Sequence, residues 1–221
     1  MKDPYVDENG VLKNKLGITD NEELKQAEAD IGFLKLINID SIDIDVFDSE
    51  LIKRIHYHIF NDIYDWAGQY RSVPVVKEEL VLPGLSLEYT SPNQIEKTLK
   101  QKVTELNSIA WQNLSTHEIA TSFARELALI WRVHPFRDGN TRTTLSFAYI
   151  YAKEHGFPFD MEMFTEALNR VYTEDGKVRS YSIRDKFVLA SLDEKDYPEV
   201  EHLARVFEYA INKEKEQGYS K

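Results

Sequence analysis

The chain has 221 residues, of which 42% are hydrophobic, enough apolar material for one sizeable core. Its formal net charge of −11 argues against non-specific nucleic-acid binding, which requires a basic surface. It contains no cysteine, so disulfides and thiolate metal sites are excluded. No apolar run reaches the length of a membrane span, and the first residues lack the apolar segment of a signal peptide. We therefore expect a single domain over residues 1–221 in the cytoplasm, with no nucleic-acid or membrane partner.

The first third of the chain is predicted to be an irregular arm followed by two helices. The arm covers residues 1–18. The first helix is predicted to start at Thr19, because Thr19 and Glu22 have the spacing of a capping box and apolar residues then recur at helical intervals. The second is predicted over residues 49–65, with Gly68 as a C-terminal cap.

Residues 71–89 change to the alternating pattern that is typical of strands, with a turn at Pro83-Gly84. We predict a small β-hairpin here and no other β element in the chain. Because Pro74 cannot donate a hydrogen bond to a neighbouring strand, the first strand is expected at an edge. A hairpin is marginal in water by itself, so it must rest on the helices.

The rest of the chain is predicted to be helical. Ser91 opens one helix, and Ser115 with Glu118 forms a capping box for another that runs to about Val133. The segment from about Arg142 to residue 155 is apolar around most of its circumference, which indicates a central helix. Three more helices are predicted near residues 161–172, 179–191 and 197–216, the last capped by Asp196. The fold class is therefore all-α, with one small hairpin.

The joint between the two most apolar helices carries the chemistry. Residues 134–142 read His-Pro-Phe-Arg-Asp-Gly-Asn-Thr-Arg. A histidine can act as a general base, a carboxylate can bind a metal, and backbone N–H groups beside an arginine at a helix N-terminus bind anions. This combination suits chemistry on a phosphate group.

This run resembles the signature of the Fic family, His-x-Phe-x-(Asp/Glu)-Gly-Asn-Gly-Arg-x-x-Arg. Two positions depart from the signature: Thr141 stands in place of a glycine, and Leu145 in place of the second arginine. The run from Trp66 to Arg71, Trp-Ala-Gly-x-x-Arg, resembles a second landmark of the family, which lies just before a hairpin called the flap. By helix order the resemblance extends over most of the chain.

The resemblance implies a protein adenylyltransferase, which moves AMP from ATP to a Ser, Thr or Tyr hydroxyl of a target protein. His134 would take the proton of that hydroxyl, and Asp138 would hold Mg²⁺ against the phosphates. The residues assigned to nucleotide binding are Gly139, Asn140, Thr141 and Arg142. Without the attached motif, His134 would more simply be a helix cap that the helix dipole favours.

Other residues near the motif are expected to have structural roles. Phe136 is expected to anchor the loop in the core, and Pro135 to hold His134 in an extended backbone conformation. The remaining histidines that we considered lack the spacing of metal ligands and are expected to be structural. They are His56, His58, His117 and His155.

Each departure from the signature has a physical consequence. Thr141 would crowd the phosphates if its position needed unusual dihedral angles, but a helical Thr141 could contact a phosphate through its hydroxyl. We favour the helical case, because Asn140 can carry the turn. Leu145 cannot bind a phosphate, and hydrogen bonds to charged groups contribute about 1.5–3 kcal/mol each. Lys77 or Arg184 could supply the missing positive charge.

In the Fic family the flap binds the target segment as an additional strand through main-chain hydrogen bonds. The resemblance assigns this role to Val75, Val76 and Lys77. Many Fic proteins are also restrained by an inhibitory helix with the pattern (Ser/Thr)-x-x-x-Glu-(Gly/Asn). Thr19 and Glu23 match its first part but not its last position. The inhibitor is thus either an antitoxin-like partner or a different device, and homo-oligomerisation is left open.

Three alternatives to AMP transfer remain at this stage. One branch of the family phosphorylates its target, with the nucleotide bound the other way round. A domain that binds proteins through its flap and has a catalytically weakened pocket is compatible with Leu145. An unrelated His/Asp hydrolase is the least favoured, for want of a second cluster of metal ligands.

Overall fold

The computed structural model describes residues 3–79, 81–82, 84, 86–160, 172–174, 177–192 and 199–218. Its helices are α1 (Asn21–Ile37), α2 (Ser49–Phe60), α3 (Ile95–Asn107), α4 (Thr116–Val133), α5 (Asn140–Glu154), α7 (Ile183–Ala190) and α8 (Val200–Gly218). Its strands are β1 (Val76–Glu78), β2 (Ser86–Glu88), β3 (Tyr172–Glu174) and β4 (Lys177–Ser180). The predicted helical fold with a hairpin at 71–89 is confirmed. Within the described residues, no helix is both long and apolar enough to cross a membrane.

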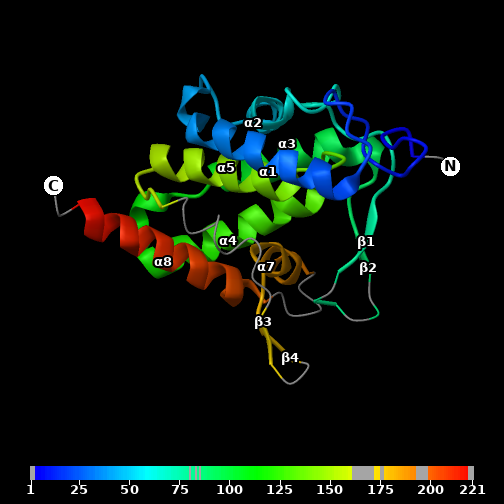
Figure 1. Cartoon of the computed structure of the whole chain (residues 1–221). Coiled ribbons are helices and arrows are strands. Elements are labelled where there is room, and N and C mark those ends of the chain that lie inside the picture. The colour runs from blue at the N-terminus through cyan, green and yellow to red at the C-terminus, as the bar shows by residue number, and fades with distance from the viewer. Residues whose placement is uncertain are drawn as a thin grey trace.

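Helix α4 is the centre of the fold (Figure 1). It packs against α3, α5, α7 and α8, while α5 also packs on α2, and α2 on α1. Phe123, in the middle of α4, has its ring within 6 Å of four other aromatic rings that close the core between α4, α5 and α8. Those rings belong to Trp111, Tyr151, Phe157 and Phe207. The joint between α4 and α5 therefore rests on a rigid interior.

The helix starts agree with the sequence patterns only in part. The predicted capping box at α4 is confirmed, since Ser115 Oγ accepts the Glu118 amide and the Glu118 carboxylate accepts the Ser115 amide. The predicted cap of α1 is wrong by one residue. Asp20, not Thr19, accepts the amides of Glu22 and Glu23, at 2.9 and 3.0 Å. A carboxylate is the better acceptor at a helix N-terminus, where the dipole adds to the hydrogen bonds.

Two further boundaries differ from the predictions. Residues 92–94 form a 3₁₀ turn without a side-chain cap at Ser91, and α3 begins only at Ile95. Helix α2 ends at Phe60 rather than near residue 65, so Gly68 is not its cap. Gly68 has a φ of +74°, and a Cβ there would lie 3.0 Å from Tyr57 Cβ and 3.2 Å from the Lys53 carbonyl oxygen. A glycine is needed at position 68 because the chain after α2 passes close to that helix there.

The described residues form two antiparallel hairpins, whereas one was predicted. In the flap, β1 pairs with β2 in the register Val76↔Glu88, Lys77↔Leu87 and Glu78↔Ser86. The flap hangs beside the helical body in Figure 1. Strands β3 and β4 form a second hairpin that periodicity did not predict, and it begins where a helix near 161–172 was expected. Residues 161–171 lie outside the described residues, as does the predicted cap at Asp196.

Helix α2 holds the loop between α4 and α5 through one buried histidine, His56. This contact fits the structural role that was expected for His56. The Gly68 amide donates to His56 Nδ1 at 2.9 Å, so the hydrogen is on Nε2, which donates to the Asp138 carbonyl oxygen at 3.1 Å. The imidazole also stacks on Phe136, with 3.8 Å between ring centroids. Burial lowers the pKa of His56 from 6.5 to about 3, so the ring is neutral at physiological pH.

This neutral histidine makes stability depend on pH. An unfolded chain protonates His56 near pH 6.5, whereas the folded chain resists protonation down to about pH 3. Its contribution is therefore complete above pH 6.5 and is lost as the pH falls through that window. We predict that His56→Gln reduces the slope of unfolding free energy against pH by about 1.4 kcal/mol per pH unit between pH 6 and 4. Urea titrations of both proteins at several pH values measure this difference, and equal slopes would contradict it.

Candidate active site

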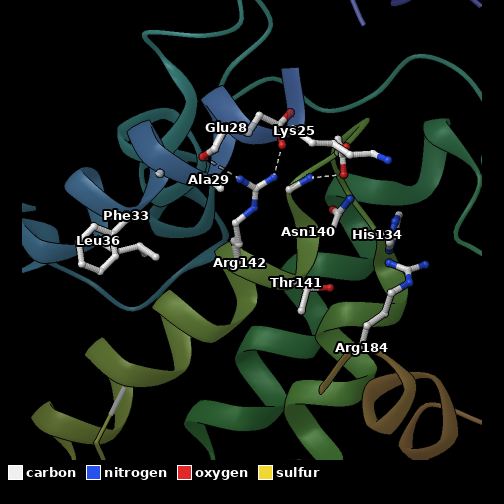
Figure 2. Close-up of a pocket in the computed structure, with 13 residues that line it drawn as sticks. Lys25, Glu28, Ala29, Phe33, Leu36, His134, Asn140, Thr141, Arg142 and Arg184 are labelled. Atoms are coloured by element: carbon white, nitrogen blue, oxygen red, sulfur yellow. Dashed lines mark hydrogen bonds and ion pairs between the residues drawn. The ribbon is translucent and has the colours of Figure 1, made fainter. Parts of the chain in front are cut away.

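A cavity of about 610 Å³ lies between α1, the loop after α4, the start of α5 and α7. Figure 2 shows its two ends: Phe33 and Leu36 of α1 lie at one, and His134 and Arg184 at the other, with Arg142 and Asn140 between them. The cavity thus brings together six residues of the motif: His134, Asp138, Gly139, Asn140, Thr141 and Arg142.

His134 ends α4 in the left-handed conformation, with φ 49° and ψ 58°. The expectation of an extended backbone is therefore wrong. The His134 amide still bonds to the Trp131 carbonyl at 3.0 Å, which curls the chain at the helix end. Arg71, from the Trp66–Arg71 run, donates from Nε to the His134 carbonyl oxygen at 2.7 Å and fixes this turn.

The His134 imidazole is only 1% exposed and stacks on the Tyr89 ring at 3.9 Å. Its Nδ1 atom is buried and has no hydrogen-bond partner among the described residues. Burial, reinforced by the positive charges of Lys77, Arg184 and Arg71, holds the pKa of His134 well below 6.5. The ring is consequently neutral at physiological pH and can accept a proton.

The loop between the two helices is closed by the Asn140 side chain. Asn140 Oδ1 accepts the Phe136 amide and Nδ2 donates to the Phe136 carbonyl, both at 2.9 Å. Phe136 is fully buried, as expected of an anchor. Gly139, not Asn140, carries the turn, with φ +76°, and a Cβ there would lie 2.4 Å from the Phe60 ring. Asn140 therefore acts on the loop through its side chain.

The start of α5 retains unused donors. Within the part of the chain that the structure describes, no side chain caps this helix, so side chains leave its first N–H groups uncompensated. Thr141 is helical, and its Oγ1 accepts a hydrogen bond from Trp131 Nε1 at 3.0 Å. Because Thr141 has helical dihedral angles, a glycine is not required at this position. The Thr141 hydroxyl can still donate its own hydrogen to a ligand. This is the arrangement for binding an anion.

Asp138 faces the cavity and is half-buried. Its Oδ1 accepts the Gly139 amide at 2.7 Å. Burial alone would raise the pKa of Asp138, but Lys77, Arg142 and the Gly139 amide outweigh it and lower the pKa. The described residues contain no group of three or more His, Cys, Asp or Glu side chains that could hold a metal alone. A single ionised carboxylate fits Mg²⁺, which takes its other ligands from phosphate and water.

Arg142 is already engaged by a carboxylate that the sequence did not reveal. Its Nη2 pairs with Glu28 Oε2 of α1 at 2.5 Å (Figure 2). Its guanidinium carbon lies 4.5 Å from the Phe60 ring centroid. Glu28 is 8% exposed and also accepts a hydrogen bond from Tyr64. A charged residue on the buried face of α1, between Leu24 and Gly32, was the available signal.

Two residues that were discussed from the sequence, Leu145 and Glu23, do not line the cavity. Leu145 is 3% exposed and is part of the core, so it contributes no phosphate contact. Glu23, from the partial match to an inhibitory helix, is exposed in the first turn of α1. The acidic residue of α1 that reaches the site is Glu28 instead.

Two flap residues act on the site. Lys77 affects the charge of Asp138, and the buried Glu79 holds Arg184. Val76 is 64% exposed on β1, while Lys77 is half-buried and its charge acts on Asp138. Burial is the main reason that the pKa of Lys77 is lowered. Glu79 is 6% exposed and accepts hydrogen bonds from Arg184 and from Tyr89 Oη. Glu79 thus links Arg184 to the flap, a contact that could not be predicted from the sequence.

The other histidines make local contacts outside the cavity. His58 Nε2 lies 2.9 Å from the Lys35 carbonyl oxygen, and His155 Nδ1 lies 2.7 Å from that of Tyr151. His117 pairs with Glu208 at 3.0 Å. These contacts fit the structural roles expected for them.

Comparison with known proteins places this site in a family. The model of the Fic/DOC family matches residues 46–152. The protein adenylyltransferase VbhT of Bartonella schoenbuchensis is 31% identical over 72% of this chain, and the matched part is 33% of VbhT. The chain thus spans about a third of the length of that relative. The probable protein adenylyltransferase y4lH of Sinorhizobium fredii is 30% identical over 75% of this chain and 85% of that protein.

Solved structures share the fold. The BepC protein of Bartonella tribocorum, with bound AMPPNP, superposes with a TM-score of 0.70 at 22% identity, covering 93% of this chain and 95% of that one. The Fic domain of Bep8 from Bartonella sp. 1-1C gives a TM-score of 0.71 at 23% identity and covers 93% of both chains. The fold is thus that of Fic domains, and the chain belongs to the Fic/DOC family.

Proposed function

We propose that this chain is a protein adenylyltransferase that transfers AMP from ATP to a hydroxyl side chain of a target protein. The observation that carries the proposal is the cavity itself, where a neutral imidazole, an ionised carboxylate and an uncapped helix N-terminus meet. The names of the relatives VbhT and y4lH support the choice of AMP as the transferred group.

His134 would act as the general base. It accepts the proton of the target hydroxyl while the hydroxyl oxygen forms a bond to the α-phosphorus of ATP. The bond from that phosphorus to the oxygen bridging to the β-phosphate breaks, and pyrophosphate leaves with the electron pair. The stacking on Tyr89 and the Arg71 bond to its carbonyl keep the imidazole in position for this transfer.

The phosphates would occupy the start of α5. The backbone N–H groups of Asn140 and Thr141 and the Arg142 guanidinium offset the charge that develops on the phosphoryl oxygens, while the Gly139 amide holds Asp138 Oδ1. Magnesium bound by Asp138 and the phosphates would withdraw further negative charge from the reacting phosphorus.

The target segment would pair with the open edge of the flap. We assign this contact to Val75, Val76 and Lys77, because β1 is an outer strand and Val76 is exposed on it. The reaction would take place in the cytoplasm, where ATP and magnesium are available. An antitoxin-like partner, or association with a second copy of the chain, would regulate this site.

The transferred group can be identified with labelled ATP. We predict that incubating the protein with a lysate and ATP labelled at the α-phosphate labels a target, whereas label at the γ-phosphate does not. Label from the γ-phosphate alone would show phosphoryl transfer and contradict the proposal. The absence of label from both, together with the absence of ATP binding, would identify a protein-binding domain.

The role of His134 can be separated from folding with His134→Asn. Asparagine tolerates the left-handed backbone that His134 adopts, so the turn is kept. We predict a loss of transfer of about 10²–10⁴-fold, because a general base is removed, with little change in the Kd of ATP. His117→Asn, an exposed histidine on α4, is the matched control. Retained transfer in His134→Asn would exclude it as the base.

Glu28 competes with the phosphates for Arg142. We predict that Glu28→Gln tightens binding of ATP and Mg²⁺ about tenfold or more. In this variant the Arg142 guanidinium does not have to break an ion pair with Glu28 before it binds the nucleotide. Isothermal titration calorimetry measures this change. Glu23→Gln, an exposed carboxylate on the same helix, should leave the affinity unaltered. Equal affinities for the two variants would mean that Arg142 binds phosphate without leaving Glu28.

A further inference from the structure

Arg184 of α7 lies at the His134 end of the cavity, a position that neither the Fic signature nor the proposed function uses. It lines the same cavity as His134, beside it in Figure 2. Two aromatic rings bridge the two residues. The Tyr89 ring stacks on His134 at 3.9 Å, and its hydroxyl lies 3.2 Å from Arg184 Nη2. The Trp131 ring lies 5.4 Å from the His134 ring and 5.4 Å from the Arg184 guanidinium carbon.

The guanidinium of Arg184 is fixed and still has donors to spare. Its Nε and Nη2 atoms donate to the two oxygens of Glu79, at 3.2 and 2.5 Å. Its Nη1 makes no hydrogen bond to any residue that the structure describes. With 30% of the side chain exposed, Arg184 is open to the cavity but held in one orientation. Such a guanidinium can bind phosphate with little loss of side-chain entropy.

The other positive charges around His134 are less suited to this task. Arg71 uses all three nitrogens on backbone carbonyl oxygens, those of His134, Val73 and Thr90. Lys77 belongs to β1, and its side chain makes no hydrogen bond within the described part of the chain that would orient it. Arg142 lies on the opposite side of the helix start, bound to α1 through Glu28.

The position beside His134 determines which phosphate Arg184 can reach. A hydroxyl that gives its proton to His134 must attack a phosphorus atom within about 3.5 Å of its oxygen. That phosphoryl group therefore lies at the His134 end of the cavity, and the leaving phosphates extend towards Arg142. In AMP transfer the group at the His134 end is the α-phosphate.

We propose that Arg184 binds a non-bridging oxygen of the attacked α-phosphate through Nη1, and that Glu79 and Tyr89 of the flap region orient it. The inference rests on the proposed AMP transfer. It gives this chain a second arginine at the phosphates, but beside the attacked phosphorus instead of at the leaving group, where Leu145 has replaced the family's arginine. It also links the flap to the phosphates, since the buried Glu79 requires Arg184 as its counter-ion.

The test is the binding of AMP, ADP and ATP with Mg²⁺ to a set of variants, measured by isothermal titration calorimetry. Arg184→Gln alone leaves Glu79 buried and unpaired, so the double variant Glu79→Gln/Arg184→Gln is included to remove both charges together. Arg184→Lys keeps the charge but loses the planar fork. Arg205→Gln, an exposed arginine on α8, is the control for the change in net charge. Thermal melting verifies that each variant is folded.

Because the α-phosphate is common to the three nucleotides, Arg184→Gln and the double variant should weaken all of them by the same factor, about 10-fold or more. Arg184→Lys should recover part of the loss, and Glu79→Gln alone should weaken binding much less. By contrast, Arg142→Gln should weaken ATP and ADP more than AMP.

Three outcomes would overturn the inference. Equal losses in Glu79→Gln and Arg184→Gln would make Arg184 only an anchor for the flap. A loss confined to ATP would place Arg184 at the terminal phosphate, with the nucleotide the other way round. If the wild-type protein binds ATP but Arg184→Gln binds all three nucleotides equally well, Arg184 contacts no phosphate. A wild-type protein that binds no nucleotide would instead refute the proposed function, and the inference with it.

Discussion

The paired hydrogen bonds between the Asn140 side chain and the Phe136 backbone are the constraint on which the site depends. They satisfy a buried amide and a buried carbonyl at once, and leaving either unpaired would cost about 1–3 kcal/mol. They close the loop tightly enough for α5 to start immediately after it. The first N–H groups of α5 then face the same cavity as His134. Without this closure the two helices would still pack, but their ends would not form a site.

Charge at the site is arranged in pairs that link separate segments. Glu28 ties Arg142 to α1, and Glu79 ties Arg184 to the flap. Each carboxylate is buried, so removing its arginine would leave an uncompensated charge in the interior. Although the chain has a net charge of −11, the positive charges of Lys77 and Arg142 act on Asp138 and lower its pKa against the effect of burial. The nucleotide would replace the contact between Glu28 and Arg142, whereas at Arg184 it would add to the pair with Glu79.

The residues that could be found from the sequence are those that repeat a spacing or a motif. The helical pattern and the Ser115–Glu118 box located α4, and the motif brought His134, Asp138 and Arg142 to one cavity. Glu28 and Glu79 could not be assigned, because their partners are more than 100 residues away in the chain. The second hairpin has no alternating pattern that we detected. The left-handed conformation of His134 depends on the Trp131 and Arg71 bonds, not on Pro135 alone.

One aromatic ring carries two of these constraints. Phe60 fills the space directly beneath Gly139, where a methyl group would be 2.4 Å from the ring, and the same ring supports the Arg142 guanidinium. The size of the side chain at position 60 is thus matched to two neighbours. It fits the absence of a side chain at position 139, and it sets the position of the Arg142 guanidinium. Substitutions at these two positions will therefore not combine additively, because a side chain at position 139 has room only if residue 60 is smaller.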